Sequence, residues 1–327
     1  MLKNLTNKIA VILFQLGGPD SLDSVEPFLY NLFSDPDIIN FPGAFLARRF
    51  IARKIAASRS TKVKENYRTI GGKSPILSLT RAQAVALEQS LNKHTNAEVF
   101  VAMRYWHPNT EEVILKIKHD TFSKIILLPL YPQYSKATTL SSIKEWKKQC
   151  ALLNYNPVQL GTIESFYTHS LYINAIINHI NSALASFTDI GPTDIDLVFS
   201  AHSIPVSYVK KGDPYQNHII ETVKLVLQKG KWNSPHTVCY QSKVGPIKWL
   251  GPSLHDAITE LTARGRKNFL IIPISFVTDH IETLHEIGIE MRKYAMENGA
   301  SRFEIMPALN NDADFIACLT ALVLEQI

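Results

Sequence analysis

The feature that most constrains the fold of this chain is a series of uninterrupted apolar runs, rich in β-branched residues, that alternate with stretches of helical period. Two of these runs, IILLPL (125–130) and FLIIPI (269–274), carry no polar residue on either face. Strands covered by helices on both faces have this composition, whereas a half-exposed strand alternates apolar and polar residues. The predicted strands are 8–16, 98–104, 124–130, 194–200, 237–241, 268–276 and 302–307.

The two halves of the chain repeat one pattern. The first half contains LFQLGGP, AMRYWHP and LLPLYPQYS, and the second contains VFSAHSIP, CYQSKVGP and IIPISFVTD. Each is a strand followed by polar or aromatic residues and a turn, and helical stretches separate them, as in βαβ units. We therefore predict an α/β fold of two similar domains, residues 1–160 and 161–327, each a parallel sheet flanked by helices. The last predicted helix, 312–326, is expected to pack back on the first domain.

Composition excludes several classes of protein. No run approaches the 18 to 20 apolar residues of a membrane-spanning helix. The three cysteines lie far apart, which argues against a disulfide framework, a cysteine-rich zinc site or a four-cysteine cluster, and favours a cytoplasmic location. A net charge of +5 does not require nucleic-acid binding, but residues 45–64 carry seven cationic side chains and no acidic one. The positive electrostatic field of this segment would attract an anionic small molecule or an anionic lipid surface.

His202 follows the strand predicted at 194–200 and stands between small residues. A lone histidine is most often a hydrogen-bonded structural residue. In open parallel sheets, however, ligands bind beyond the carboxyl ends of the strands. A neutral imidazole at that place could accept protons from a substrate nitrogen or hold a borderline metal ion.

An acidic cluster follows the strand predicted at 268–276. Asp279 and His280 come first, and Glu282, Glu286 and Glu290 follow at steps of four residues. On a helix this spacing places three carboxylates along one stripe, where they repel one another unless a cation is present. The stripe is either a solvated acidic face or a path for a divalent cation with nitrogen and oxygen ligands.

Aromatic and proline-rich turns follow the other predicted strands, at 105–108, 131–134 and 241–252. Such residues often only form turns and core, but several of them at one edge of a sheet would form an apolar slot for a flat ligand. The basic stretch 44–64 is interleaved with Phe45, Leu46, Phe50 and Ile51, which predicts an amphipathic helix. It is either an ordinary surface helix or a lip, residues 41–64, that dips into a membrane surface.

Five segments in this order, LGGPDSL, YRTIGGKSP, FSAHSIP, QSKVGPIKWLGP and SFVTDHIETLHE, resemble those of ferrochelatases, and the similarity runs through essentially the whole chain. The resemblance implies two Rossmann-like domains with a porphyrin in the cleft between them, into which ferrous iron is inserted without redox change. It implies that His202 is the catalytic histidine and that Glu282 faces it across the macrocycle. Glu286 and Glu290 match a line of acidic residues that leads away from the site. The expected iron ligands are therefore His202, Glu282, Glu286 and Glu290. Asp279 and His280 match the shell that supports Glu282.

The resemblance also implies substrate-binding residues. Arg59, Tyr67 and Ser74 fall where ferrochelatases anchor the porphyrin propionates, and Arg104, Tyr134 and Trp249 match other pocket residues. Leu16 occupies the position of a tyrosine in members that use coproporphyrin, so protoporphyrin IX is the expected substrate and haem b the product. The small number of cysteines resembles the bacterial type without a C-terminal iron–sulfur extension.

Iron is then a substrate, and no resident cofactor or nucleic-acid partner is expected. Peripheral contact with an anionic inner membrane is expected from the basic stretch. Which of His202 and Glu282 takes the pyrrole protons stays open. Two alternatives also remain: a related chelatase that inserts cobalt or nickel into a more carboxylated tetrapyrrole, and a non-catalytic tetrapyrrole carrier.

Overall fold

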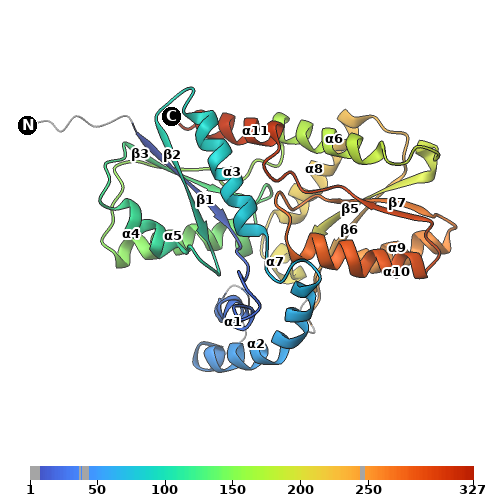
Figure 1. The fold of residues 1–327 in the computed structure, drawn as a ribbon, viewed down its shortest axis with the longest axis horizontal. Helices are drawn as coiled ribbons and strands as arrows, with labels where there is room; N and C mark the ends of the chain where they lie inside the picture. Colours follow the sequence, from blue (N-terminus) through green and yellow to red (C-terminus); the bar gives the residue numbers. More distant parts are fainter. Residues whose placement is uncertain (1–7, 37, 39–43, 244–246) are drawn as a thin grey trace, which may run out of the picture. The chain divides into compact units, whose positions relative to one another are not determined.

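In the computed structural model, which describes residues 8–36, 38, 44–243 and 247–327, the chain divides into two compact units (Figure 1). The first unit comprises Met1–Ser165 together with Ile316–Ile327, and the second comprises Phe166–Phe315. For residues 44–46 the structure describes the backbone only.

The first unit is built on a parallel sheet of four strands in the order β2-β1-β3-β4. These are β1 (Ile9–Gln15), β2 (Ala97–Met103), β3 (Lys124–Pro129) and β4 (Leu160–Thr162). Every residue of β1 is buried, as its continuous apolar run predicted. One face of the sheet packs against α4 (Thr110–Ile117) and α5 (Ser141–Leu152), where Phe14 meets Trp146 edge to face.

The other helices of this unit are α1 (Val25–Ser34), α2 (Ala44–Arg68), α3 (Ile76–Leu91) and most of α11 (Ala313–Leu324). Helix α11 lies against α3, where the Thr320 hydroxyl hydrogen-bonds to Ser90 at 2.9 Å. Helix α2 buries a row of small side chains, Ala52, Ala56 and Ser60, four residues apart. Apart from Tyr67, the rest of its described surface is exposed or partly exposed and rich in cationic side chains. Its apolar residues are not gathered on one broad stripe, so it is less amphipathic than predicted.

The second unit repeats this architecture with a parallel sheet in the order β6-β5-β7-β8. Its strands are β5 (Ile195–His202), β6 (His236–Gln241), β7 (Asn268–Pro273) and β8 (Arg302–Ile305). Helices α9 (Leu254–Ala263) and α10 (Arg292–Glu297) share one core with the sheet. The unit also contains α6 (Ser170–Leu184), a 3₁₀ turn η2 (Pro192–Asp194), α7 (Val206–Lys210) and α8 (Tyr215–Gly230). The predicted α/β class with two similar parallel sheets is confirmed.

In both units the third strand leads into a π-helix, η1 (Lys136–Leu140) in the first and η3 (Glu282–Met291) in the second. π-Helices are rare and are often found at functional sites. The four-residue spacing of Glu282, Glu286 and Glu290 predicted a helix in the second of these segments, but not this wider form. β4 was not predicted either, because three residues that include a glycine carry no period. Among the described residues, none of the helices has the length and apolar character that a membrane crossing needs.

Candidate active site

His202 is the last residue of β5, and its backbone is held from two sides. Its N–H donates to the Ser275 hydroxyl at 2.9 Å, and its carbonyl accepts from the Tyr215 hydroxyl at 2.9 Å. The imidazole itself is partly exposed. A side chain on so rigid a support is placed with little conformational freedom, as a reacting group requires.

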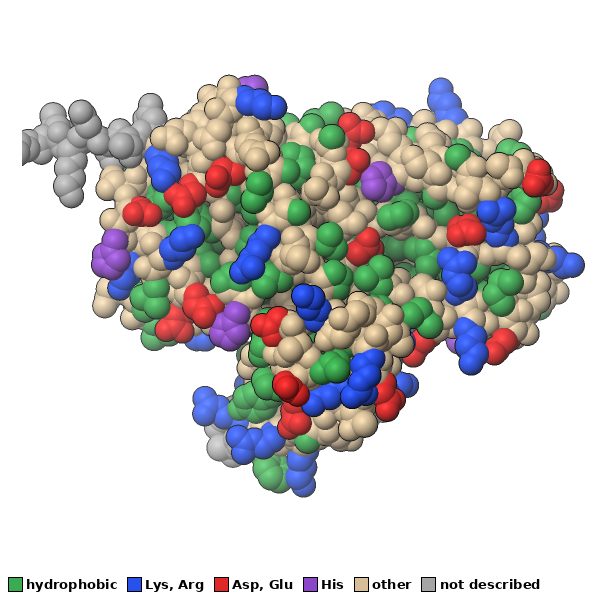
Figure 2. All heavy atoms as spheres, viewed as in Figure 1, with side chains coloured by type: hydrophobic (Ala, Val, Ile, Leu, Met, Phe, Trp, Pro, Cys, Tyr) green, Lys and Arg blue, Asp and Glu red, His purple; other side chains and the backbone are tan. Residues whose placement is uncertain are grey.

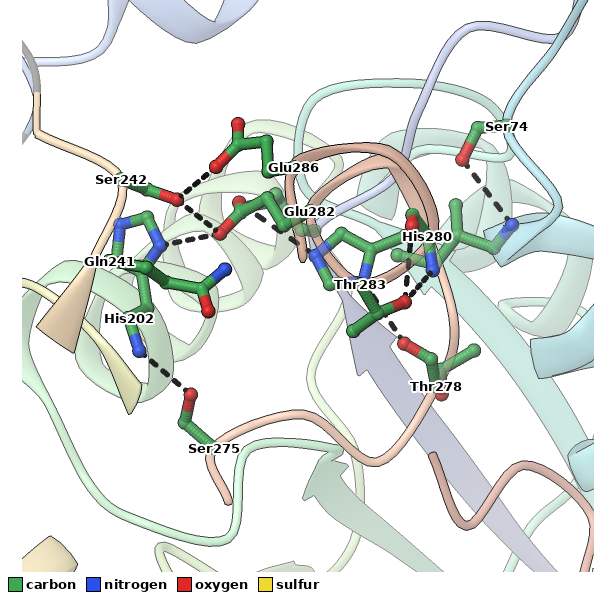
Figure 3. A network of polar contacts seen from close by, with 12 residues as sticks. Ser74, His202, Gln241, Ser242, Ser275, Thr278, His280, Glu282, Thr283 and Glu286 are labelled. Atoms are coloured by element: carbon green, nitrogen blue, oxygen red, sulfur yellow. Dashed lines mark hydrogen bonds and ion pairs between the residues drawn. The ribbon is translucent and has the colours of Figure 1, made fainter. Parts of the chain in front are cut away.

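His202 and Glu282 form a direct pair (Figure 3), with Nδ1 of the imidazole 2.8 Å from Oε2 of the carboxylate. The other carboxylate oxygen of Glu282 lies 3.7 Å from Nε2 of His280. The prediction that His202 and Glu282 face each other across a macrocycle is wrong for this structure, because 2.8 Å leaves no room for a ring. His202 ends β5 and Glu282 follows β7, its parallel neighbour in the sheet, so the two residues meet at the same edge.

The predicted carboxylate stripe runs along η3 from the inside of the unit outwards. Glu282 is 14% exposed, whereas Glu290 is 49% exposed and lies with Oε1 3.2 Å from Nε2 of His285. Glu286 lies between them along the stripe. The Ser242 hydroxyl is 2.6 Å from the carboxylate of Glu286 and 3.0 Å from that of Glu282. Of the four predicted iron ligands, the structure thus brings His202, Glu282 and Glu286 into one network. Among the described side chains, no three histidines, cysteines or carboxylates form a ready-made metal site.

The charges of this network follow from burial and proximity. Burial of the imidazole opposes its protonation, but the adjacent carboxylate of Glu282 outweighs it and raises the pKa of His202. Burial opposes ionisation of Glu282 too, yet the charge of His202 and its hydrogen bond hold the pKa of Glu282 well below its usual range. Burial, and then the negative charge of Glu282, raise the pKa of Glu286 to about 7. Glu282 therefore favours the ionised form of its own carboxylate and stabilises a proton on His202, beside a carboxyl group, Glu286, that readily gains or loses a proton at neutral pH.

The two residues predicted to support Glu282 act differently. Asp279 anchors the start of η3: it accepts from the hydroxyl of Thr283 and the amide of Asn310, both at 2.8 Å, and its own N–H donates back to Asn310 at 3.0 Å. His280 is buried, and its Nδ1 lies 3.1 Å from the carbonyl oxygen of Thr278. That contact turns Nε2 towards the carboxylate of Glu282 (Figure 3).

The residues predicted to bind propionates lie in the first unit. Arg59 is on the exposed side of α2, with its guanidinium 5.6 Å from the ring of Phe33. Tyr67 is buried near the end of the same helix. Ser74 is buried directly before α3, and its N–H donates to the carbonyl of Pro19 at 2.8 Å. Gly18 is required there, because a Cβ on it would come within 2.6 Å of the Ser74 side chain.

Arg104, predicted as a pocket residue, is held by neighbours of its own unit. Its Nη2 lies 2.5 Å from the buried carboxylate of Asp35, and its Nε donates to the Ser141 hydroxyl at 3.0 Å. Asp35 also accepts from the Tyr105 hydroxyl at 2.8 Å. This network lines a cavity of about 630 Å³ at the carboxyl end of β2.

The remaining predicted pocket residues, Leu16, Tyr134 and Trp249, are all partly buried and follow β1, β3 and β6 respectively. Trp249 forms an isolated bridge with Pro205. Three residues of the QSKVGP motif, 244–246, lie outside the described residues. Sequence reasoning missed Ser242 as a member of the network, although its place directly after β6 could have marked it. It also missed Asp35.

Comparisons with solved structures agree with the two-sheet α/β fold. Among solved structures, the chain resembles the sirohydrochlorin chelatase SirB of Bacillus subtilis subspecies spizizenii, solved in complex with cobalt. The TM-score is 0.55 at 10% identity, over 98% of this chain and 95% of that one, a likeness that concerns the fold.

Curated relatives are much closer in sequence. A protein named ferrochelatase from Geotalea uraniireducens is 47% identical over 319 residues, 98% of both chains. Another so named, from Trichodesmium erythraeum, is 43% identical over 98% of this chain and 83% of its own length. The Ferrochelatase family model matches residues 8–327. The chain therefore belongs to the ferrochelatase family.

Proposed function

We propose that this chain inserts ferrous iron into protoporphyrin IX, giving haem b and two protons, as the last step of haem synthesis. Family membership makes the chain a porphyrin metal chelatase with porphyrin and ferrous iron as substrates. The observation that carries the proposal is the pair of His202 and Glu282 at 2.8 Å, with Glu286 joined to it through Ser242. A proton acceptor and a line of carboxylates meet at one place, which is what exchanging two pyrrole protons for a divalent ion requires.

The geometry favours His202 as the proton acceptor. Glu282 engages Nδ1 of the imidazole, so Nε2 is the ring nitrogen left to meet a pyrrole N–H. A carboxylate on one imidazole nitrogen fixes the tautomer in which the other accepts a proton, as in serine hydrolases. Glu282 then has a second role, because its negative charge attracts iron(II) to the same side of the porphyrin. Two protons leave the pyrrole nitrogens as one ferrous ion is bound, with no electron transfer and no resident cofactor.

The proposed substrate is protoporphyrin IX because the position after β1 is Leu16, a half-buried apolar residue. An apolar side chain there favours an apolar ring substituent over the additional carboxylate groups of coproporphyrin. Arg59 supplies an exposed cation for a propionate group, and Ser74 a hydroxyl.

We further propose that the protein works in the cytoplasm and touches an anionic membrane surface through α2, without a nucleic-acid partner. Lysine and arginine side chains gather over α2 (Figure 2). Phe50 on this helix is 62% exposed, and Nζ of Lys54 lies 4.6 Å from its ring. Cations beside an exposed aromatic ring match the interfacial region of an anionic bilayer.

An anaerobic insertion assay tests the function. Protoporphyrin IX or coproporphyrin is mixed with iron(II), cobalt(II) or nickel(II), and the loss of porphyrin fluorescence is followed. We expect the fastest loss with protoporphyrin and iron(II). Faster cobalt or nickel insertion into the more carboxylated ring would indicate a different chelatase, and binding without insertion would indicate a carrier.

A single variant links the activity to the site. His202→Ala should reduce insertion by about 10²–10⁴-fold, the usual contribution of a general base. His119→Ala, which alters an exposed histidine of the first unit, is the matched control and should retain full activity. Near-normal turnover in His202→Ala would overturn the assignment of the site.

A further inference from the structure

Ser242, the first residue after β6, has an unusual backbone conformation. Its φ is +63°, in the left-handed region. Of the other non-glycine residues in that region among those described, two are asparagines and one, Lys231, is the C-cap of α8. These are situations in which positive φ is common, whereas a serine at a strand end is not one of them. Such a conformation is strained and persists where the surroundings enforce it, often at functional sites.

The strained conformation directs the hydroxyl between two carboxylates (Figure 3). Oγ of Ser242 lies 3.0 Å from Oε2 of Glu282 and 2.6 Å from Oε2 of Glu286. A hydroxyl carries one proton, so it donates to only one of them at a time. When Glu286 is ionised, two carboxylates meet on this one donor, and a divalent cation there would offset the negative charge that His202 does not.

The spacing of these oxygens also suits a cation. Neighbouring oxygen ligands of a small octahedral divalent ion, with bonds near 2.1 Å, lie about 3 Å apart. The two distances at Ser242 are close to that value before any ion is bound. The Ser242 hydroxyl therefore lies at the spacing of neighbouring ligands from each of the two carboxylates, and it links them through one atom.

Gln241, the last residue of β6, supports the arrangement around Ser242. It lies opposite His202 in the β5–β6 register and is 6% exposed. Its Oε1 accepts from the buried hydroxyl of Ser200 at 2.7 Å, while its Nε2 is buried with no hydrogen-bond partner among the described residues. A buried amide N–H without an acceptor is unfavourable, which points to a polar partner beyond the described residues. Gln241 and Ser242 line one cavity of about 270 Å³ with Glu286 and Glu290.

From these observations we infer that Ser242 is a positioning residue for iron transfer: it holds Glu286 against Glu282, so that a ferrous ion taken up at Glu286 reaches Glu282 without losing its oxygen ligands. The inference rests on the proposed function. It places Ser242 between the cavity at the outer carboxylates and the His202–Glu282 pair. No bond is made or broken at Ser242, and its effect is exerted through the two glutamates.

The test uses Ser242→Ala and Ser242→Gly in the full-length protein. Glycine adopts positive φ freely, so Ser242→Gly removes the hydroxyl while relieving the backbone and should not lower the melting temperature. Both variants should raise the KM for iron(II) at least tenfold, with the KM for porphyrin and the kcat at saturating iron within about threefold of the parent. Lys231→Gly relieves the same backbone conformation away from the site and is the matched control with unchanged kinetics.

Two further measurements distinguish positioning from a general structural effect. Titration with cobalt(II) alone, followed by its visible absorption, should show at least tenfold weaker binding in Ser242→Gly. In a Glu286→Gln background, Ser242→Gly should have little additional effect on the KM for iron, because its action depends on Glu286. An unchanged KM for iron and unchanged cobalt affinity in Ser242→Gly would overturn the inference while leaving the proposed function intact. Absence of metal insertion by the parent protein would overturn the function, and cobalt binding would still test the inference.

Discussion

Replacement of Asp35 by alanine should lower the thermal stability of the first unit. The Asp35 side chain is 2% exposed and lies 2.5 Å from the guanidinium of Arg104, which is 17% exposed. It also accepts hydrogen bonds from the hydroxyls of Tyr105 and Ser141, at 2.8 and 3.4 Å. Alanine at position 35 would leave a largely buried cation without its counter-charge and a buried tyrosine hydroxyl without its acceptor.

The size of the effect follows from this geometry. Removing one partner of a buried ion pair costs about 3–5 kcal/mol, and the remaining exposure of Arg104 lets water offset part of it, leaving about 2–4 kcal/mol. The first unit has about 180 residues. For a unit of that size 1 kcal/mol corresponds to about 2–4 °C, so its melting temperature should fall by roughly 5–15 °C.

Differential scanning calorimetry is the suitable assay, because the two units can melt in separate transitions. Asp23→Ala, at an exposed position of the same unit, is the control and should melt like the parent. Asp35→Ala combined with Arg104→Leu should recover most of the loss, since replacing both members of a buried pair is often close to neutral. Equal melting of the Asp35 and Asp23 variants, or a double variant as unstable as Asp35→Ala, would refute the reasoning.

Three further predictions concern the site and the surface. Because burial and then the charge of Glu282 raise the pKa of Glu286 to about 7, Glu282→Gln should lower that pKa towards, but not to, the ordinary 4.5. An NMR titration of labelled glutamate measures this, and an unchanged midpoint would contradict it. Between pH 4.5 and 7 folded Glu286 keeps a proton that the unfolded chain has released, so its contribution to the free energy of unfolding falls as pH rises through that window. Asp279→Ala should reduce iron insertion at least tenfold while porphyrin affinity, measured by fluorescence quenching, is retained, because the start of η3 loses its anchor. Arg53→Glu with Lys54→Glu should weaken sedimentation with anionic vesicles and leave neutral vesicles unaffected, and equal binding to both would count against the membrane proposal.

Much of the fold could be predicted from local patterns. The strands β1, β3 and β7 fall inside predicted runs, because a strand buried on both faces needs an unbroken apolar stretch, and β5 extends two residues beyond the run predicted for it. The location of His202 near the end of a strand was predicted in the same way. β4, with only Leu160–Thr162, had too few residues to show a period. The π-helical form of η3 was missed because four-residue spacing fits α- and π-helices almost equally.

The network around Glu282 shows where prediction from sequence ends. Its carboxylate spacing was visible, and the family resemblance supplied the roles of His202 and Glu282. The direct contact between them was not predicted, and neither was the hydroxyl that joins Glu282 to Glu286. Ser242 lies 40 and 44 positions before its two partners, and its left-handed backbone has no signature in the residues beside it.

The sequence by itself determined that this is an α/β chain with two similar parallel sheets, with a histidine and a line of carboxylates just beyond the ends of two strands. These properties follow from neighbouring residues, whose period and polarity determine which side chains are buried. Only the tertiary structure decided which of those groups touch, which carry charge and which are strained. Charge and strain depend on burial and on partners far apart in the chain, as in Arg104 with Asp35 and in Ser242 with its two glutamates.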